Sequence, residues 1–205
     1  QKIESKFIRG LRVTDEKIIS VVETVLIDFN DDIVNSLKKI GSKAVSLHTK
    51  KDNVIEIIPE QEELGFVGIP NKINTETIFE KLKNNMIPII SPLGLGENEQ
   101  TYNINGDHAA GAVAKSLKSR RLLLMTNVEG VLNREKKLIS EINSSKIIEM
   151  IEDKTITEGM IPKINTCLDA VKNDVTAVGI IDGRKPRSVL FELFSDKGSG
   201  TLIRK

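Results

Sequence analysis

Apolar side chains recur every three or four residues through several stretches of the chain, the spacing that places them on one face of a helix. In the first stretch, Ile18, Val22 and Val25 follow Thr14, a residue suited to cap a helix. A second helix is expected directly afterwards and is predicted to stop at Gly41. With the first at residues 14–29, the other helices are predicted at 31–40, 75–84, 107–117, 144–151, 161–172 and 188–194.

Short apolar runs lie between these helices and predict strands. They are found at residues 87–90, 122–125, 177–181 and 201–203, with one hairpin expected to pair 44–47 with 54–58 and another at 131–139. Short buried strands that alternate with amphipathic helices are typical of α/β proteins, because both faces of a parallel sheet must be covered. The sequence therefore predicts an α/β fold with a mainly parallel open sheet sandwiched between helices.

Composition narrows the classes of function. The 205 residues include 30 Lys+Arg and 29 Asp+Glu, and a formal net charge of +1 argues against a general nucleic-acid binder. Apolar runs such as Leu122–Met125 are far shorter than the roughly 20 residues that cross a bilayer. The single Cys167 cannot form an intramolecular disulfide, and His48 and His108 lack the spacing of metal ligands. We expect a cytoplasmic protein with no nucleic-acid partner, no membrane contact and no metal site of its own.

Two loops carry candidate chemistry, because ligands of open α/β sheets bind at the carboxyl ends of strands. The loop after residues 87–90 leads to Asn103 and Asn105, whose amides donate and accept hydrogen bonds, and to Asp107, which is placed to cap a helix. The loop at 125–132 offers hydroxyl, amide and backbone groups that suit a nucleotide. Ordinary turns, one of them with a helix cap, explain both loops as well.

Two basic residues stand at the starts of predicted helices. Lys163 follows Pro162 in the first helical turn, where a positive charge opposes the helix dipole. A bound phosphate group would explain this lysine, since it needs both free backbone N–H groups and a cation. Arg12 can hold a carboxylate with its planar guanidinium, although a lone arginine is usually a solvated surface residue.

One resemblance rests on several segments taken together and in order. They are Gly10–Asp15, Leu64–Gly68, Ile87–Gly94, Tyr102–Asp107, Gly159–Lys163 and Glu192–Thr201. These segments are similar to signature stretches of the N-acetylglutamate kinases, a branch of the amino acid kinase family, and they span essentially the whole chain. The resemblance implies ATP-dependent phosphorylation of the side-chain carboxylate of N-acetyl-L-glutamate, with Mg²⁺ carried by ATP, in arginine biosynthesis. Aspartate, carbamate and UMP kinases share the fold, but the Arg12 and Asn103 stretches favour acetylglutamate.

The same resemblance implies roles for individual residues. Arg12 would hold the α-carboxylate of the substrate and Asn103 its acetylamino group. Asp107 would orient catalytic lysines, and Lys163 would neutralise charge on the transferring phosphoryl group. The residues implied to contact ATP are Asn127, Val128, Glu129, Gly130, Val131, Leu132, Thr155, Ile156 and Thr157. Residues 1–118 would then form the acetylglutamate-binding lobe and residues 119–205 the nucleotide-binding lobe of one continuous sheet.

The C-terminal stretch resembles the arginine-inhibited branch of this family. Glu192, Gly198 and Gly200 would contact L-arginine as a feedback inhibitor, although Arg187 stands where that branch usually has His. The resemblance also implies a homo-oligomer, either a dimer or a hexamer.

Family members carry a catalytic Lys and Gly-rich loops in a segment that would precede Gln1. We therefore expect the chain to be a fragment whose activity belongs to its parent, with very low or no kinase activity by itself. The alternative is a non-catalytic relative that binds arginine or a partner protein. A dinucleotide-binding fold is disfavoured, because no Gly-x-Gly-x-x-Gly follows a first strand.

Overall fold

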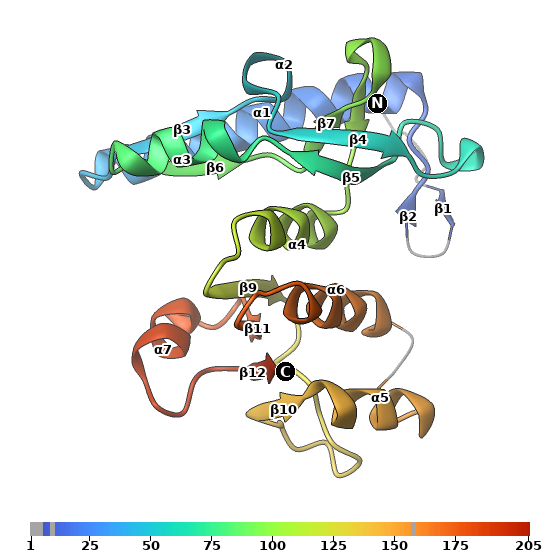
Figure 1. The fold of residues 1–205 in the computed structure, drawn as a ribbon, viewed down its shortest axis with the longest axis vertical. Helices are drawn as coiled ribbons and strands as arrows, with labels where there is room; N and C mark the ends of the chain where they lie inside the picture. Colours follow the sequence, from blue (N-terminus) through green and yellow to red (C-terminus); the bar gives the residue numbers. More distant parts are fainter. Residues whose placement is uncertain (1–5, 9–10, 157–158) are drawn as a thin grey trace. The chain divides into compact units, whose positions relative to one another are not determined.

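The chain forms two compact units, residues 1–109 and 110–205, in a computed structural model that describes residues 6–8, 11–156 and 159–205 (Figure 1). The boundary between the units falls inside helix α4 (Gly106–Ser116). Two predicted positions, Gly10 and Thr157, lie outside the described residues.

Unit 1 begins with the antiparallel strands β1 (Phe7–Ile8) and β2 (Leu11–Arg12), followed by the long helix α1 (Glu16–Lys39). The residue that caps α1 is Asp15 and not Thr14, because the Asp15 carboxylate accepts a hydrogen bond from the backbone N–H of Ile18 (2.8 Å). The two helices predicted at 14–29 and 31–40 are one helix. Asn30 does not interrupt it, because its buried side-chain amide donates to the carbonyl of Ile89 and to the hydroxyl of Ser91.

The remaining elements of unit 1 are short strands joined by helical turns. They are β3 (Ala44–Leu47), α2 (Thr49–Asp52), β4 (Ile55–Pro59), η1 (Glu62–Leu64), β5 (Gly68–Ile73), α3 (Thr75–Lys83), β6 (Ile87–Ile90), β7 (Leu93–Leu95), η2 (Glu97–Glu99) and β8 (Thr101–Asn103). The hairpin expected between residues 44–47 and 54–58 was wrong. β3 pairs in parallel with β6, whereas β4 pairs antiparallel with the next strand, β5, and parallel with β7.

Unit 2 contains a four-stranded sheet in the order β10-β12-β11-β9. Its elements are β9 (Arg121–Thr126), β10 (Glu141–Asn143), α5 (Ser144–Glu152), α6 (Ile161–Lys172), β11 (Ala177–Asp182), α7 (Ser188–Phe194) and β12 (Thr201–Arg204). β9 runs parallel to β11 and β10 parallel to β12, whereas β11 and β12 are antiparallel. The hairpin predicted at 131–139 is present as a short one: Leu132 and Leu138 form an antiparallel bridge, and backbone N–H groups donate from Ile139 to Val131 and from Asn133 to Lys137 (both 2.9 Å). Ile164 and Cys167 of α6 are completely buried in the core, as the helical spacing predicted.

The predicted α/β class is confirmed, with helices covering sheets that contain parallel pairs. The described strands fall into four hydrogen-bonded groups, two of them with four strands each. Within residues 6–8, 11–156 and 159–205, no helix is long and apolar enough to cross a membrane.

Gly200 is required where the chain enters β12, and replacing it tests the packing of unit 2. A Cβ atom there would lie 2.0 Å from the backbone oxygen of Ile180, so the backbone of β11 must move. We expect Gly200→Ala to lower the free energy of unfolding by about 1–3 kcal/mol, measured by urea denaturation. The matched control is Gly159→Ala, because a Cβ at Gly159 meets nothing within 4 Å. Equal stabilities of the two variants would contradict the predicted clash.

Candidate functional site

Three predicted segments of unit 1 meet through backbone hydrogen bonds. The N–H of Thr14 donates to the carbonyl of Leu64 (2.9 Å), and the N–H of Phe66 donates to the carbonyl of Thr14 (2.7 Å). The N–H of Asn103 in turn donates to the carbonyl of Phe66 (2.9 Å). The segment that carries Arg12 and the segment that carries Asn103 are therefore joined through residues 64–66.

Gly65 makes this crossing close. Its φ angle is 66°, and a Cβ atom there would lie 2.4 Å from the backbone oxygen of Thr14. Only glycine tolerates both the left-handed conformation and the contact. Thr14 is completely buried at the crossing, whereas Arg12 is exposed and Asn103 half-buried. The backbone is thus fixed while both polar side chains keep access to solvent.

Asp107 lies in the first turn of α4 but does not cap it, which corrects the sequence prediction. The cap is Asn105, whose side-chain oxygen accepts from the N–H groups of Asp107 (2.9 Å) and His108 (3.2 Å). A cap acts on the N–H groups two and three residues ahead of it, and Asn105 holds that position. Helix capping therefore does not explain why an aspartate stands at position 107.

A pocket of about 520 Å³ in unit 2 brings together two segments assigned to the nucleotide. Val128 and Gly130–Leu132 line it from the loop after β9, and Thr155–Ile156 line it from the segment after α5. Of the other residues assigned to ATP, Asn127 and Glu129 belong to the same loop but do not line the pocket.

Thr201 fixes the loop after β9, and its role was missed from the sequence. Its buried hydroxyl accepts from the N–H of Val131 (2.8 Å) and donates to the carbonyl of Ile139 (2.7 Å). Gly130 has a φ angle of 145°, and a Cβ there would lie 2.5 Å from the Thr201 hydroxyl oxygen. The loop after β9 is thereby tied to the start of β12.

Further residues line the same pocket and were also missed. They are Asn133, Arg134, Lys136, Asp153, Lys154 and Met160. The charged run at 133–137 looks like an ordinary polar turn, and its periodicity gives no sign of a site. Only the fold brings this run of residues to the same pocket as Thr155.

Lys163 lies in the first turn of α6, and this helix begins one residue after Met160, which lines the pocket. Met160 both precedes α6 and lines the pocket, and it gives the helix no side-chain cap. Pro162 has no N–H to offer, and Lys163 is half-buried. An uncapped helix N-terminus with a lysine in its first turn favours an anion.

Ion pairs connect the loops that follow β9 and β11. Asp182, at the end of β11, is buried and accepts two hydrogen bonds from the guanidinium of Arg184 (both 2.9 Å). Lys185 pairs with Glu129 (2.5 Å) and so joins the two loops, and Glu129 does not line the pocket. The hydrogen bonds from Arg184 lower the pKa of Asp182 to about 2, so this carboxylate is charged at neutral pH.

The residues assigned to arginine lie together in unit 2. Glu192 of α7 is buried, and its carboxylate accepts from the backbone N–H of Ser199 (2.8 Å). A Cβ at Gly198, whose φ angle is 65°, would lie 2.8 Å from the same carboxylate. Gly200 packs against the backbone of Ile180. The glycines therefore bring the loop backbone up to Glu192.

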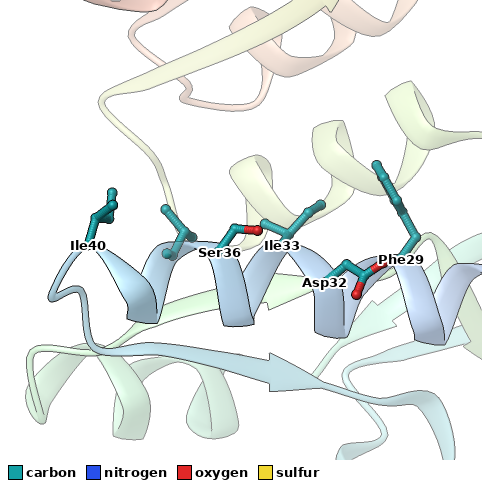
Figure 2. Close-up of a pocket in the computed structure, with 6 residues that line it drawn as sticks. Phe29, Asp32, Ile33, Ser36 and Ile40 are labelled. Atoms are coloured by element: carbon teal, nitrogen blue, oxygen red, sulfur yellow. The ribbon is translucent and has the colours of Figure 1, made fainter.

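A second hollow, of about 340 Å³, lies on the surface of α1 and contains none of the predicted site residues. Figure 2 shows Phe29, Ile33 and Ile40 rising from the same side of the helix. All of its lining residues belong to α1 or to the residue that caps its C-terminus, namely Phe29, Asp32, Ile33, Ser36, Leu37 and the cap residue Ile40. Within the described part of the chain, no group of three or more His, Cys, Asp or Glu side chains could hold a metal ion.

Comparison with known proteins gives one consistent result. A model of the amino acid kinase family matches residues 1–182. Acetylglutamate kinase from Pelagibacter ubique (strain HTCC1062) is 55% identical over 203 residues, which cover 99% of this chain and 70% of that protein. A solved structure of smu.665 from Streptococcus mutans UA159 is 33% identical, with a TM-score of 0.84, covering 99% of this chain and 78% of that one. N-acetylglutamate synthase from Neisseria gonorrhoeae shares the fold (TM-score 0.88, 24% identity, 98% of this chain and 47% of that one).

The Asp182–Arg184 pair gives a pH-dependent prediction. The folded pKa of Asp182 is lowered, so its contribution to stability is complete above the ordinary value of 3.8 and is lost as pH falls towards about 2. We expect Asp182→Asn to have a lower Tm than the unchanged protein at pH 6, and the gap to narrow between pH 4 and pH 2. Glu135→Gln, which removes an exposed pair with Lys137, is the control and should change Tm little. A gap that stays constant down to pH 2 would rule out this linkage.

Proposed function

The chain belongs to the amino acid kinase family and, within it, to the acetylglutamate kinases, and from this we propose how its two units divide the reaction. Unit 2 binds MgATP, and unit 1 binds N-acetyl-L-glutamate through Arg12 and Asn103. The observation that carries the proposal is the pocket of about 520 Å³, where the loop after β9 meets Thr155 and Ile156. Its buried side chains, Val131 and Ile156, offer an apolar surface for a nucleobase.

Phosphoryl transfer to a carboxylate needs position and positive charge more than proton transfer. A side-chain carboxylate oxygen of the substrate forms a bond to the γ-phosphorus, the bond to the bridging oxygen breaks, and ADP leaves with the electron pair. In this proposal Lys163 stabilises the negative charge on the transferring group, together with the N–H groups at the start of α6. Asp107 holds catalytic lysines in position.

The substrate contacts follow from the chemistry of the two side chains. The guanidinium of Arg12 presents a planar set of donors that matches a carboxylate, here the α-carboxylate. The amide of Asn103 can both donate to and accept from the acetylamino group. Their two segments are joined at the backbone through Phe66, which supports a shared role.

Three wider assignments complete the proposal. Residues 1–118 form the acetylglutamate-binding lobe and residues 119–205 the nucleotide-binding lobe. The protein works as a homo-oligomer in the cytoplasm. Exposed apolar side chains on α1, such as Val25 (56%) and Phe29 (61%), support an oligomer, since large apolar surface is costly in water.

Lys163→Ala tests the catalytic assignment. We expect the rate of ADP formation with N-acetyl-L-glutamate and MgATP to fall by about 10²- to 10³-fold, because a group that stabilises transition-state charge is removed. The control is Lys172→Ala, an exposed lysine at the other end of α6. Since the chain covers 70% of its Pelagibacter relative, both the 205-residue chain and a form extended upstream to the first in-frame Met are assayed.

Two results would contradict this assignment. If Lys163→Ala retains the activity of Lys172→Ala, Lys163 does not act on the phosphoryl group. If neither form of the unchanged protein makes ADP, the kinase reaction itself is refuted and the non-catalytic binding alternative is favoured.

We also propose that L-arginine binds beside Glu192, because a buried carboxylate against a glycine-containing loop suits a guanidinium ligand. We expect L-arginine to inhibit the extended kinase and L-lysine to have little effect. Glu192→Gln should raise the concentration for half-inhibition by about 10-fold or more. An arginine titration that leaves activity unchanged would refute the proposal.

A further inference from the structure

Two walls of the nucleotide pocket come from separate stretches of unit 2. One wall is the loop after β9 and the turn at 133–137, and the other is the segment 153–156 that follows α5. Val131 and Ile156, which are buried and belong to the same hydrophobic core, define the bottom of the pocket. The charged lining residues are exposed and define its mouth, namely Arg134, Lys136, Asp153 and Lys154. The apolar bottom is thus held by packing, whereas the mouth needs another means of keeping its walls in place.

Arg134 connects the walls at the mouth. Its Nη2 donates to the carboxylate of Asp153 (2.8 Å), and its Nε lies 3.3 Å from the hydroxyl oxygen of Thr155 as donor. Asp153 also accepts from the backbone N–H of Thr155 (2.9 Å), which closes a tight turn. Arg134 thereby holds a turn that contains one of the residues assigned to ATP.

Each wall is ordered locally, so the connection acts between two preformed turns. Asn133 accepts from the N–H groups of Glu135 (3.0 Å) and Lys137 (2.9 Å), which fixes the turn that carries Arg134. The N–H of Asp153 donates to the carbonyl of Glu149 (2.9 Å) at the end of α5. Because both turns are already ordered, the contacts of Arg134 mainly fix the distance between the turns and add little to the structure within each turn.

Exposure shows that this connection contributes little to global stability. The side chain of Arg134 is 72% exposed and that of Asp153 is 38% exposed, and exposed ion pairs add little to folding free energy. The hydrogen bonds from Thr155 lower the pKa of Asp153, so the carboxylate remains charged for Arg134 across the physiological range. Removing Arg134 should leave a folded protein with a looser pocket mouth.

We propose that Arg134 is a positioning residue for the nucleotide, acting through Asp153 and Thr155 to tie the two walls of the pocket together at a fixed separation. This inference rests on the proposed function, since it assumes that unit 2 binds ATP. The inference gives Arg134 and Asp153 a role in nucleotide affinity and no role in the chemical step. The bound nucleotide then gains affinity because the walls are ordered before it arrives.

The test measures binding of MgADP by calorimetry and of adenosine by competition, on the extended protein. Arg134→Met should weaken both by the same factor, about 3- to 10-fold, because the ordering of the walls must then accompany binding. The KM for ATP should rise by a similar factor while kcat stays unchanged. Asp153→Asn should have an effect of the same kind, and the double variant should show no further loss, because both break one connection.

Two further variants complete the design. Arg134→Lys keeps the charge but loses the fork that reaches both partners, so its affinities should be intermediate. Lys137→Met is the matched control, because Lys137 forms an exposed pair with Glu135 on the same turn (2.8 Å) and does not line the pocket. It should bind like the unchanged protein.

Several outcomes would overturn the inference. Unchanged affinities in Arg134→Met would show that the connection has no role in binding. A loss for MgADP without a loss for adenosine would show that Arg134 contacts phosphate directly, and additive effects of the two substitutions would show that the residues act separately. If the unchanged protein binds neither ligand, the proposed function fails first, and the inference falls with it.

Discussion

The parallel pairing of β9 with β11 is the constraint on which the chemistry of unit 2 depends. It runs in register from Arg121 opposite Ala177 to Thr126 opposite Asp182, so both strands end at the same edge. The loops that follow are then neighbours, and their charged residues pair across the gap. Completely buried side chains such as Ile180 hold this pairing in the core. The pocket and the Asp182 ion pair are arranged around this edge. The Glu192 region lies towards the opposite end of the strands, where the guanidinium of Arg121 donates to the backbone carbonyl of Glu192 (3.1 Å).

The contacts that hold the pocket in place range from completely buried to exposed. The Thr201 hydroxyl, completely buried, ties the loop after β9 to β12. Val131 and Ile156 pack beneath, and the exposed guanidinium of Arg134 spans the mouth. Because the energetic value of a polar contact rises with burial, the inner layer determines the fold of the loop. The outer layer is free to adjust ligand affinity without risk to folding.

In unit 1, main-chain hydrogen bonds fix the site, and the side chains around them stay accessible. Thr14, residues 64–66 and Asn103 come from three separate stretches of the sequence and form one crossing of main-chain hydrogen bonds. Gly65 permits the close approach, and side chains at the rim remain accessible. The crossing brings together the segments of Arg12 and Asn103, the two residues that the proposal assigns to the substrate. Three of the segments that resemble the acetylglutamate kinases meet at this point.

Local periodicity determined most helices and strands of this protein, including α6 and α7 at their observed bounds, because amphipathic spacing depends on near neighbours alone. Motif order identified the family, and the resemblance implied the two segments assigned to the nucleotide. Strand partners were decided only by the tertiary structure, as the parallel pairing of β3 with β6 shows. So were the cap at Asn105, the bond from Thr201 and the span made by Arg134. Some of these contacts join groups that are distant in sequence, and in others neighbouring side chains compete for the same N–H group. The pattern of hydrophobic and polar residues does not determine which of the possible partners forms the contact.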